Sequence, residues 1–181
     1  MILNTTKRFG LVSIFLHWLI AVVMLGLFAL GWYMVDLTYY DALYNTLPFI
    51  HKSIGILVAL IFLFWVAWKW FSTTPGPLQG SSRFEIIASR LMHSVLNILI
   101  ALIVLSGYLI STADGSGVDV FNLFEVPATV TGIPQQEDIA GLIHEYLAYI
   151  LIGLVLLHAA AALKHHFVDR DNILRRMLGI R

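Results

Sequence analysis

The sequence predicts an all-α integral membrane protein, a four-helix bundle with up-and-down topology. Of its 181 residues 59% are apolar and only 12% are charged, and the mean hydropathy is +0.85. A soluble domain is nearer half apolar and a quarter charged, so this composition indicates lipid as the solvent. Four apolar stretches each approach the roughly 20 residues that a helix needs to cross a bilayer. Hydrocarbon offers unpaired backbone groups no partner, so these stretches are expected to be helices.

The chain divides into four predicted spans and their connections. The spans cover about residues 11–35, 50–70, 86–110 and 139–163. The third connection, Ser111–Gln136, is long, acidic and rich in glycine and proline, and its Gly132-Ile133-Pro134 run predicts the start of the last span. Residues from about 169 to 178 predict a short amphipathic helix at the membrane interface. We find no internal repeat, so residues 1–181 are expected to form one domain.

Charges are distributed unevenly between the two ends of the predicted bundle. The end that holds the N-terminus, the second connection and the C-terminus carries three acidic residues, Glu85, Asp169 and Asp171, and these basic ones: Lys7, Arg8, Lys69, Arg83, Arg90, Lys164, Arg170, Arg175, Arg176 and Arg181. The other end has one basic residue, Lys52, and these acidic ones: Asp36, Asp41, Asp114, Asp119, Glu125, Glu137, Asp138 and Glu145. The positive-inside rule therefore predicts that both termini are cytoplasmic.

Two features of the composition exclude whole classes of function. Lysine plus arginine equals aspartate plus glutamate at 11 each, so the net charge is zero and nothing favours nucleic-acid binding. The chain has no cysteine, which excludes disulfides, iron–sulfur clusters, thiolate zinc sites and covalently attached haem. Any haem bound here must be non-covalent.

Seven histidines stand out in so apolar a chain, and five of them fall in or at the ends of spans. An ionisable group inside a membrane indicates a functional site by default. With the predicted topology, His51 and His144 lie near the outer surface. The other three, His17, His93 and His158, lie a turn or two in from the inner surface.

The fourth span predicts two ligands on one face. His144 and His158 are fourteen residues apart, which is close to four helical turns, so both face the same side about 21 Å apart along the axis. A flat iron macrocycle needs two axial imidazoles from opposing helices. His51 is the outer partner for His144, whereas the inner partner of His158 is either His17 or His93. The alternative is that these are core imidazoles hydrogen-bonded between helices, or that they bind zinc or another metal.

Small residues lie near two of these histidines. Gly55 comes one turn after His51, and Ala162 one turn after His158. They could leave room for a macrocycle, or they could simply let the helices pack closely, as small residues do in membranes.

Four segments make the sequence similar to the bacterial di-haem, quinone-linked cytochromes b561. They are R-F-G-x-x-S-I-F-L-H-W-L around His17, H-K-S-I-G from His51, G-Y-L-I-S-T-A-D-G from Gly107 and V-L-L-H-A-A-A-A-L-K-H-H-F from Val155. The last, with the D-R-D-N-I-L-R-R-M that follows it, is the most specific. The resemblance extends over essentially the whole chain.

The resemblance implies two haem b groups, each held by two histidines. In that family the inner haem is held from the first and fourth helices, which implies His17 and His158. The outer haem is held from the second and fourth helices, which implies His51 and His144. The resemblance thus selects His17 over His93, which helical spacing does not do.

Five further residues are candidates for contact with a haem or a quinone. His93 shares a polar strip with Arg90 and Asn97, which would contact inner haem propionates or a quinone headgroup, or would be an interfacial patch. Lys164 and His165 end the fourth span, and Lys52 follows His51, where each could reach a propionate or a haem edge. The alternative for Lys164 and His165 is a cationic helix end beside anionic lipid.

The resemblance also implies the function. We expect a multi-pass protein of the bacterial inner membrane that transfers electrons between a donor on the periplasmic side and the quinone pool, with ubiquinone as acceptor or donor. Superoxide is one candidate donor, which would make the protein a superoxide:ubiquinone oxidoreductase, although eight acidic residues on the outer side would repel this anion.

The alternative is a haem-b membrane anchor that passes electrons to or from a soluble periplasmic partner, which the long acidic loop would bind. Membrane lipid and a second copy of the chain are further expected partners. An ion or proton transporter is disfavoured, since the spans have no central carboxylate or proline.

Overall fold

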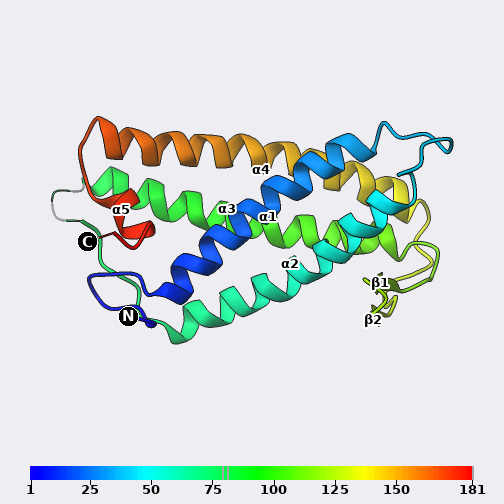
Figure 1. Ribbon diagram of the computed structural model, residues 1–181, viewed down its shortest axis with the longest axis horizontal. Coiled ribbons are helices and arrows are strands. Elements are labelled where there is room, and N and C mark those ends of the chain that lie inside the picture. The colour runs from blue at the N-terminus through cyan, green and yellow to red at the C-terminus, as the bar shows by residue number, and fades with distance from the viewer. Residues whose placement is uncertain (79, 81, 181) are drawn as a thin grey trace.

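The chain forms a bundle of four long helices, with a small hairpin at one end and a short helix at the other (Figure 1). The computed structural model describes residues 1–78, 80 and 82–180, so Arg181, one of the basic residues counted above, lies outside the described residues. The elements are α1 (Leu11–Met34), α2 (Thr46–Phe71), α3 (Arg83–Ser111), β1 (Val118–Val120), β2 (Phe124–Val126), α4 (Gln136–Phe167) and α5 (Ile173–Met177). All four long helices are long and apolar enough to cross a membrane.

Each predicted span lies within one helix, apart from Val35, which caps α1. α2, α3 and α4 extend past their predicted spans at both ends, and at the start of α3 a side-chain cap supports the extension. Ser82 and Glu85 form a capping box at the start of α3, in which the serine hydroxyl accepts the Glu85 N–H and the Glu85 carboxylate accepts the Ser82 N–H. In α4 the first turn is acidic and the last turn is basic, which suits the helix dipole at both ends.

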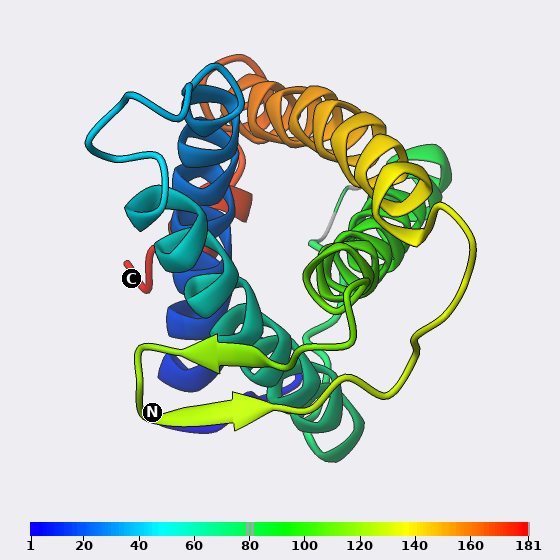
Figure 2. The same ribbon diagram turned by 90° about the vertical axis from the view of Figure 1, so that its right-hand side faces the viewer.

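The helices pack in the order expected for an up-and-down bundle. α3 runs along α4 and α1 along α2, α2 also packs on α3, and α1 and α4 touch over only a short stretch (Figure 2). The N-terminus, the α2–α3 connection and α5 share one end (Figure 1). We call this the basic end, which consists of residues 1–10, 72–78, 80, 82 and 168–180 with the adjoining turns of the long helices. The opposite one, residues 35–45 and 112–135 with the adjoining helix turns, is the acidic end.

The core lies midway along the bundle and draws on all four long helices. Its buried members are Ile20, Met24, Leu27, Val58, Phe62, Leu99, Ile100, Ile103 and Leu151. Most other large apolar side chains of the helices are exposed on the outside of the bundle. Such an exterior is stable in hydrocarbon and costly in water, which agrees with a membrane-spanning bundle.

The long third connection contains a hairpin, which the all-α prediction lacks. β1 and β2 pair antiparallel, with Val120 opposite Phe124, and β1 alternates two buried valines with the exposed Asp119. Ser53 of α2, fully buried, anchors this hairpin: its hydroxyl donates to the Asp119 carbonyl at 3.3 Å and accepts the Phe121 N–H at 3.2 Å. That contact across 68 residues of sequence holds Phe121 at a positive φ of 52°, which a non-glycine residue adopts rarely. Local sequence does not encode it.

At the basic end, α5 contacts α1, the N-terminal segment and the α2–α3 connection. The Trp18 indole N–H donates to the Met177 carbonyl at 2.8 Å. The Arg176 guanidinium donates to the Gly76 carbonyl at 3.2 Å and lies over the Phe9 ring at 5.6 Å. The C-terminal segment therefore joins the N-terminus to the α2–α3 connection.

Candidate functional site

Four of the histidines form two pairs inside the bundle, one toward each end. We call His51 of α2 and His144 of α4 the outer pair, whose ring centres are 6.2 Å apart with planes 72° from parallel. The inner pair is His17 of α1 and His158 of α4, whose ring centres are 6.4 Å apart with planes 64° from parallel. Helix α4 thus contributes one imidazole to each pair, as the fourteen-residue spacing predicts.

Both pairs have the separation that a shared metal requires. A metal–imidazole bond is about 2 Å long, so two imidazoles that bind one metal from opposite sides have ring centres roughly 6 Å apart. His93 is nearer to His158, at 4.9 Å between ring centres, which leaves less room for a metal between them. The geometry therefore favours His17 as the partner of His158.

The hydrogen bonds of His144 leave one of its nitrogens free for a metal. Nδ1 of His144 lies 3.0 Å from the Ile103 carbonyl and 3.1 Å from Oγ of Ser106. A carbonyl only accepts, so Nδ1 carries the proton and Nε2 keeps its lone pair. Ligating histidines usually donate their other N–H in this way, which orients the ring and raises its basicity.

Two glycines make room for the outer pair. A Cβ on Gly31 would lie 3.2 Å from Cε1 of His51, and one on Gly107 would lie 3.1 Å from Cε1 of His144. Each imidazole of the outer pair thus lies against a glycine of a neighbouring helix. Gly55, the small residue that the sequence suggests, would meet no protein atom within 4 Å if it gained a Cβ. Sequence reasoning missed Gly31 entirely, and took Gly107 only as part of a motif, because which helices face each other was unknown.

The outer pair also contains an unsatisfied buried atom. Nδ1 of His51 is buried and has no hydrogen-bond partner among the described residues. A buried polar atom without a partner costs free energy unless a bound group satisfies it. The donor set, four imidazoles without cysteine, suits the iron of haem b. The residues present therefore fit that group.

The core side chains lie between the two pairs. Leu151, only 3% exposed, stands seven residues from both His144 and His158 on α4. On the facing helices Met24 and Val58 occupy the same layer. This apolar layer keeps the pairs apart and excludes water from the space between them.

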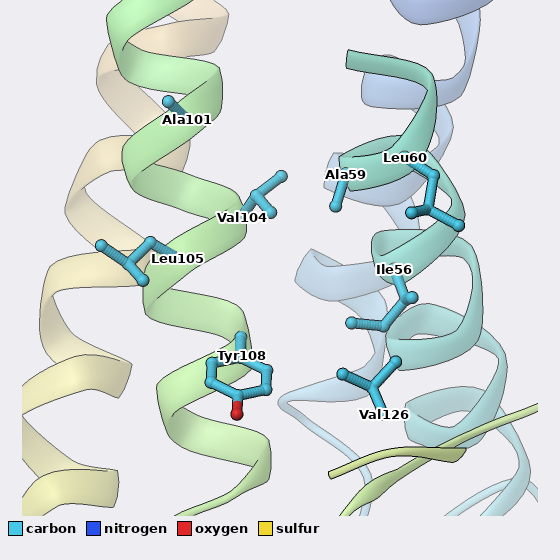
Figure 3. A pocket seen from close by; sticks show the side chains of 8 residues that line it. All are labelled: Ile56, Ala59, Leu60, Ala101, Val104, Leu105, Tyr108 and Val126. Atoms are coloured by element: carbon cyan, nitrogen blue, oxygen red, sulfur yellow. The ribbon is translucent and has the colours of Figure 1, made fainter. Parts of the chain in front are cut away.

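An apolar groove of about 290 Å³ opens between α2 and α3 in the half of the bundle that holds the outer pair (Figure 3). Its lining residues are Ile56, Ala59, Leu60, Ala101, Val104, Leu105, Tyr108 and Val126. The Tyr108 hydroxyl donates to the Pro127 carbonyl at 2.8 Å and accepts the Thr129 N–H at 2.8 Å, so it fastens the loop after β2. The groove suits the hydrocarbon part of a ligand or lipid.

The polar strip on α3 lies beside the inner pair. Nδ1 of His93 donates to the Ser89 carbonyl at 2.7 Å, and the Asn97 amide donates to the His93 carbonyl at 2.6 Å. Arg90, one turn before His93, is exposed. The structure therefore brings His93 to the inner pair, and shows for Arg90 no ion pair within the part of the chain that it describes.

Lys164 and His165 lie in a cluster of charges at the basic end. Nζ of Lys164 donates to the Asp169 carboxylate at 2.8 Å, and Nδ1 of His165 lies 2.9 Å from Asp169 and 3.1 Å from Asp171. The Lys164 ammonium holds the pKa of the Asp169 carboxyl below its usual range. Both side chains, which the sequence suggests for a haem edge or propionate, thus bind the segment after α4, because the chain reverses there.

Lys52 lies at the acidic end beside the outer pair. It is exposed and lines a cavity of about 320 Å³ together with Met34, Tyr44, Asn45, Pro48 and Phe49. Pro48 and Phe49 belong to the first turn of α2, and Tyr44 and Asn45 to the preceding connection. Lys52 follows His51 directly in α2, so this polar cavity lies next to the outer pair.

The chain is similar to known proteins along almost its whole length. Residues 8–179 match the family of prokaryotic cytochrome b561. Over 176 residues the chain is 47% identical to cytochrome b561 homolog 2 of Escherichia coli (strain K12), covering 97% of this chain and 94% of that protein. It is 28% identical over 176 residues to cytochrome b561 homolog 1 of the same organism, covering 95% and 97%. It is 25% identical over 180 residues to the probable superoxide oxidase CybB of Yersinia pestis, covering 95% and 96%.

These similarities agree with the four long apolar helices and the paired histidines. The helices account for a multi-pass protein, and the half-buried, paired imidazoles suit a non-covalent iron cofactor. The chain therefore belongs to the prokaryotic cytochrome b561 family, the haem-b electron carriers of the bacterial inner membrane.

Proposed function

We propose that this protein carries electrons across the membrane between two haem b groups, one in each histidine pair. The observation that supports this is the pair of imidazoles at each end of the bundle, with ring centres 6.2 and 6.4 Å apart. Each haem, when bound, supplies a one-electron ferric/ferrous couple. His17 and His158 hold the inner haem, and His51 and His144 hold the outer one.

The protein's own contribution is ligation, spacing and exclusion of water. Ile103 and Ser106 orient His144, and Gly31 and Gly107 leave the space that the two rings of the outer pair occupy. The apolar layer around Leu151 keeps the two sites roughly 21 Å apart along α4 between their ligands.

The direction of the bundle follows from its charges. The basic end lies in the cytoplasm and the acidic end in the periplasm, by the positive-inside rule. Electrons from a periplasmic donor enter at the outer pair and leave at the inner pair to a quinone, with ubiquinone as the proposed acceptor. Arg90 and His93 on α3, and Lys164 and His165 at the end of α4, are the candidate contacts for that quinone or for the inner haem propionates. Lys52 has the corresponding position at the outer haem.

The haem stoichiometry tests this proposal. Pyridine haemochrome assays of the purified chain are expected to give two haems b for the native protein and one for both His51→Ala and His17→Ala. His166→Ala, a histidine outside both pairs, is the control and should keep two. One haem in the native protein, or two in either ligand variant, would contradict the assignment.

Superoxide is a candidate for the periplasmic donor. One relative is named a probable superoxide oxidase, and Lys52 lines a recess next to the outer pair. The acidic residues of the outer side are all exposed, however, and their field repels an anion: they are Asp36, Asp41, Asp114, Asp119, Glu125, Glu137, Asp138 and Glu145. Superoxide-driven quinone reduction by the purified protein should therefore become faster with added salt, and a decrease would show that local positive charge steers the substrate.

The second candidate is a membrane anchor for a soluble redox protein with a basic face. The same exposed carboxylates favour it, together with a hairpin that is held rigidly on α2. Co-purification of a periplasmic redox protein that is lost at high salt would support this candidate. Full activity of the isolated protein with superoxide and quinone would refute it. A second copy of the chain is a further proposed partner, and the mass of the purified protein tests it.

A further inference from the structure

Helix α3 contributes none of the four paired imidazoles, yet it touches both of the histidines that α4 contributes. At the outer pair, the Ile103 carbonyl accepts the Nδ1–H of His144 at 3.0 Å, and Ser106 lies 3.1 Å from the same nitrogen. At the inner pair, the imidazole of His93 on α3 meets that of His158, with ring centres 4.9 Å apart and planes 76° from parallel. His93 thus lies beside His158 as Ile103 and Ser106 lie beside His144.

A hydrogen bond to its own helix selects which ring nitrogen of His93 is the donor. Nδ1 of His93 lies 2.7 Å from the Ser89 carbonyl, which can only accept, so this nitrogen carries a proton and donates it. In the neutral ring Nε2 then keeps its lone pair and can accept a hydrogen bond. The Asn97 amide, which donates to the His93 carbonyl at 2.6 Å, strengthens the same turn of α3.

His158 lacks the partner that His144 has. No hydrogen bond of the His158 side chain is present among the described residues, although its ring meets those of His17 and His93. A metal-bound imidazole almost always donates its second N–H to an acceptor, which sets its orientation and its basicity. Near His158, the imidazole of His93 has a ring nitrogen that can be such an acceptor.

We infer that His93 is a positioning residue for the inner site: its Nε2 accepts the second N–H of His158, as the Ile103 carbonyl does for His144. This inference rests on the proposed function, because it requires His158 to be a ligand. The two rings meet edge to face with centres 4.9 Å apart, a separation at which two imidazoles can share one N–H···N hydrogen bond. Helix α3 then sets the basicity of the α4 ligand at both sites.

The inference predicts a change in redox potential without loss of haem. An acceptor on the second N–H makes an imidazole a stronger electron donor, which stabilises ferric over ferrous iron. His93→Phe keeps a ring of similar size and removes the acceptor. It should shift the ferric/ferrous ratio of the inner haem toward ferrous by about tenfold at a given potential, which is a rise of about 59 mV for one electron. His93→Gln, whose amide oxygen accepts, should restore most of the native value.

The experiment is a redox titration of the full-length, haem-loaded protein in lipid nanodiscs. The inner haem is identified in a His51→Ala background, which is expected to lack the outer one. Ser94→Ala, one residue along the same helix and exposed, is the matched control and should leave both potentials unchanged. Ser106→Ala should move the potential of the outer haem only.

Three results would overturn the inference, and one of them also overturns the proposed function. An unchanged inner potential in His93→Phe shows that His93 does not act on His158. Loss of the inner haem in His93→Phe, as complete as in His17→Ala, shows that His93 is itself a ligand. Absence of b-type bands from the native protein removes the proposed function and this inference together, and the native spectrum alone separates that case from the other two.

Discussion

Gly107 lies against the imidazole of His144, so close that a Cβ on the glycine would stand 3.1 Å from Cε1 and 3.4 Å from Nδ1 of the ring. Gly31 has the same relation to His51 at 3.2 Å. Each ring of the outer pair therefore occupies space that a side chain on the neighbouring helix would take. Glycine at both positions leaves room for the two imidazoles to pair.

Gly107→Ala should weaken the outer site. Overpacking of this kind costs about 1–3 kcal/mol, which exceeds the helix propensity gained by alanine, about 1 kcal/mol. We expect a lower haem content and an altered spectrum of the outer haem with the inner haem intact. Gly153→Ala in α4 is the control, because a Cβ there meets nothing within 4 Å. Equal behaviour of the two variants would contradict the steric role of Gly107.

Ser53→Ala should release the hairpin from α2. The substitution leaves the Phe121 N–H and the Asp119 carbonyl without their partner, at a cost of about 1–3 kcal/mol. Amide hydrogen exchange in residues 118–126 should become faster, while the haem spectrum stays native. Ser116→Ala, an exposed serine of the same connection that binds only Asp114, should change nothing there. Unchanged exchange in Ser53→Ala would show that packing alone holds the hairpin.

Asp169 should titrate below the usual carboxyl value of 3.8, because the Lys164 ammonium donates to its carboxylate. A lowered pKa in the folded protein means that the interaction is fully present above the usual value and is lost as the pH falls through the lower one. The titration of the Asp169 carboxyl resonance by NMR measures this shift. Lys164→Gln should raise the pKa toward 3.8, and high salt should do so in part, since the pair is exposed. A pKa that ignores both changes would contradict the ion pair.

Arg176→Ala should detach the C-terminal segment from the basic end. The variant loses two hydrogen bonds to the Gly76 carbonyl and the contact with the Phe9 ring. Limited proteolysis should then cut within residues 168–180 more rapidly. Arg175→Ala is the matched control, because Arg175 is exposed and its side chain makes no hydrogen bond within the described chain. Equal cleavage of both variants would mean that the Trp18–Met177 bond suffices to hold α5.

Much of the fold could be predicted because it depends on local composition. The four long helices follow from the length of the apolar stretches. A stretch of about 20 apolar residues crosses the hydrocarbon as a helix, because a helix pairs its backbone groups within the segment. The fourteen-residue spacing on α4 places two imidazoles on one face whatever the neighbouring helices do. The β1–β2 hairpin was not predicted, because its short strands and the positive φ of Phe121 depend on Ser53, 68 residues away.

Some features of the candidate site are likewise local in the sequence, and others depend on contacts between distant segments. Imidazoles at two depths, and the lack of any cysteine, can be recognised in the amino-acid sequence alone, because residue type and helical phase are local properties. The groups that contact those rings are known only from the folded structure: Gly31 and Gly107, the Ile103 carbonyl, and His93 with its ring centre 4.9 Å from that of His158. These contacts depend on how the helices are rotated and paired, and packing between distant segments sets that.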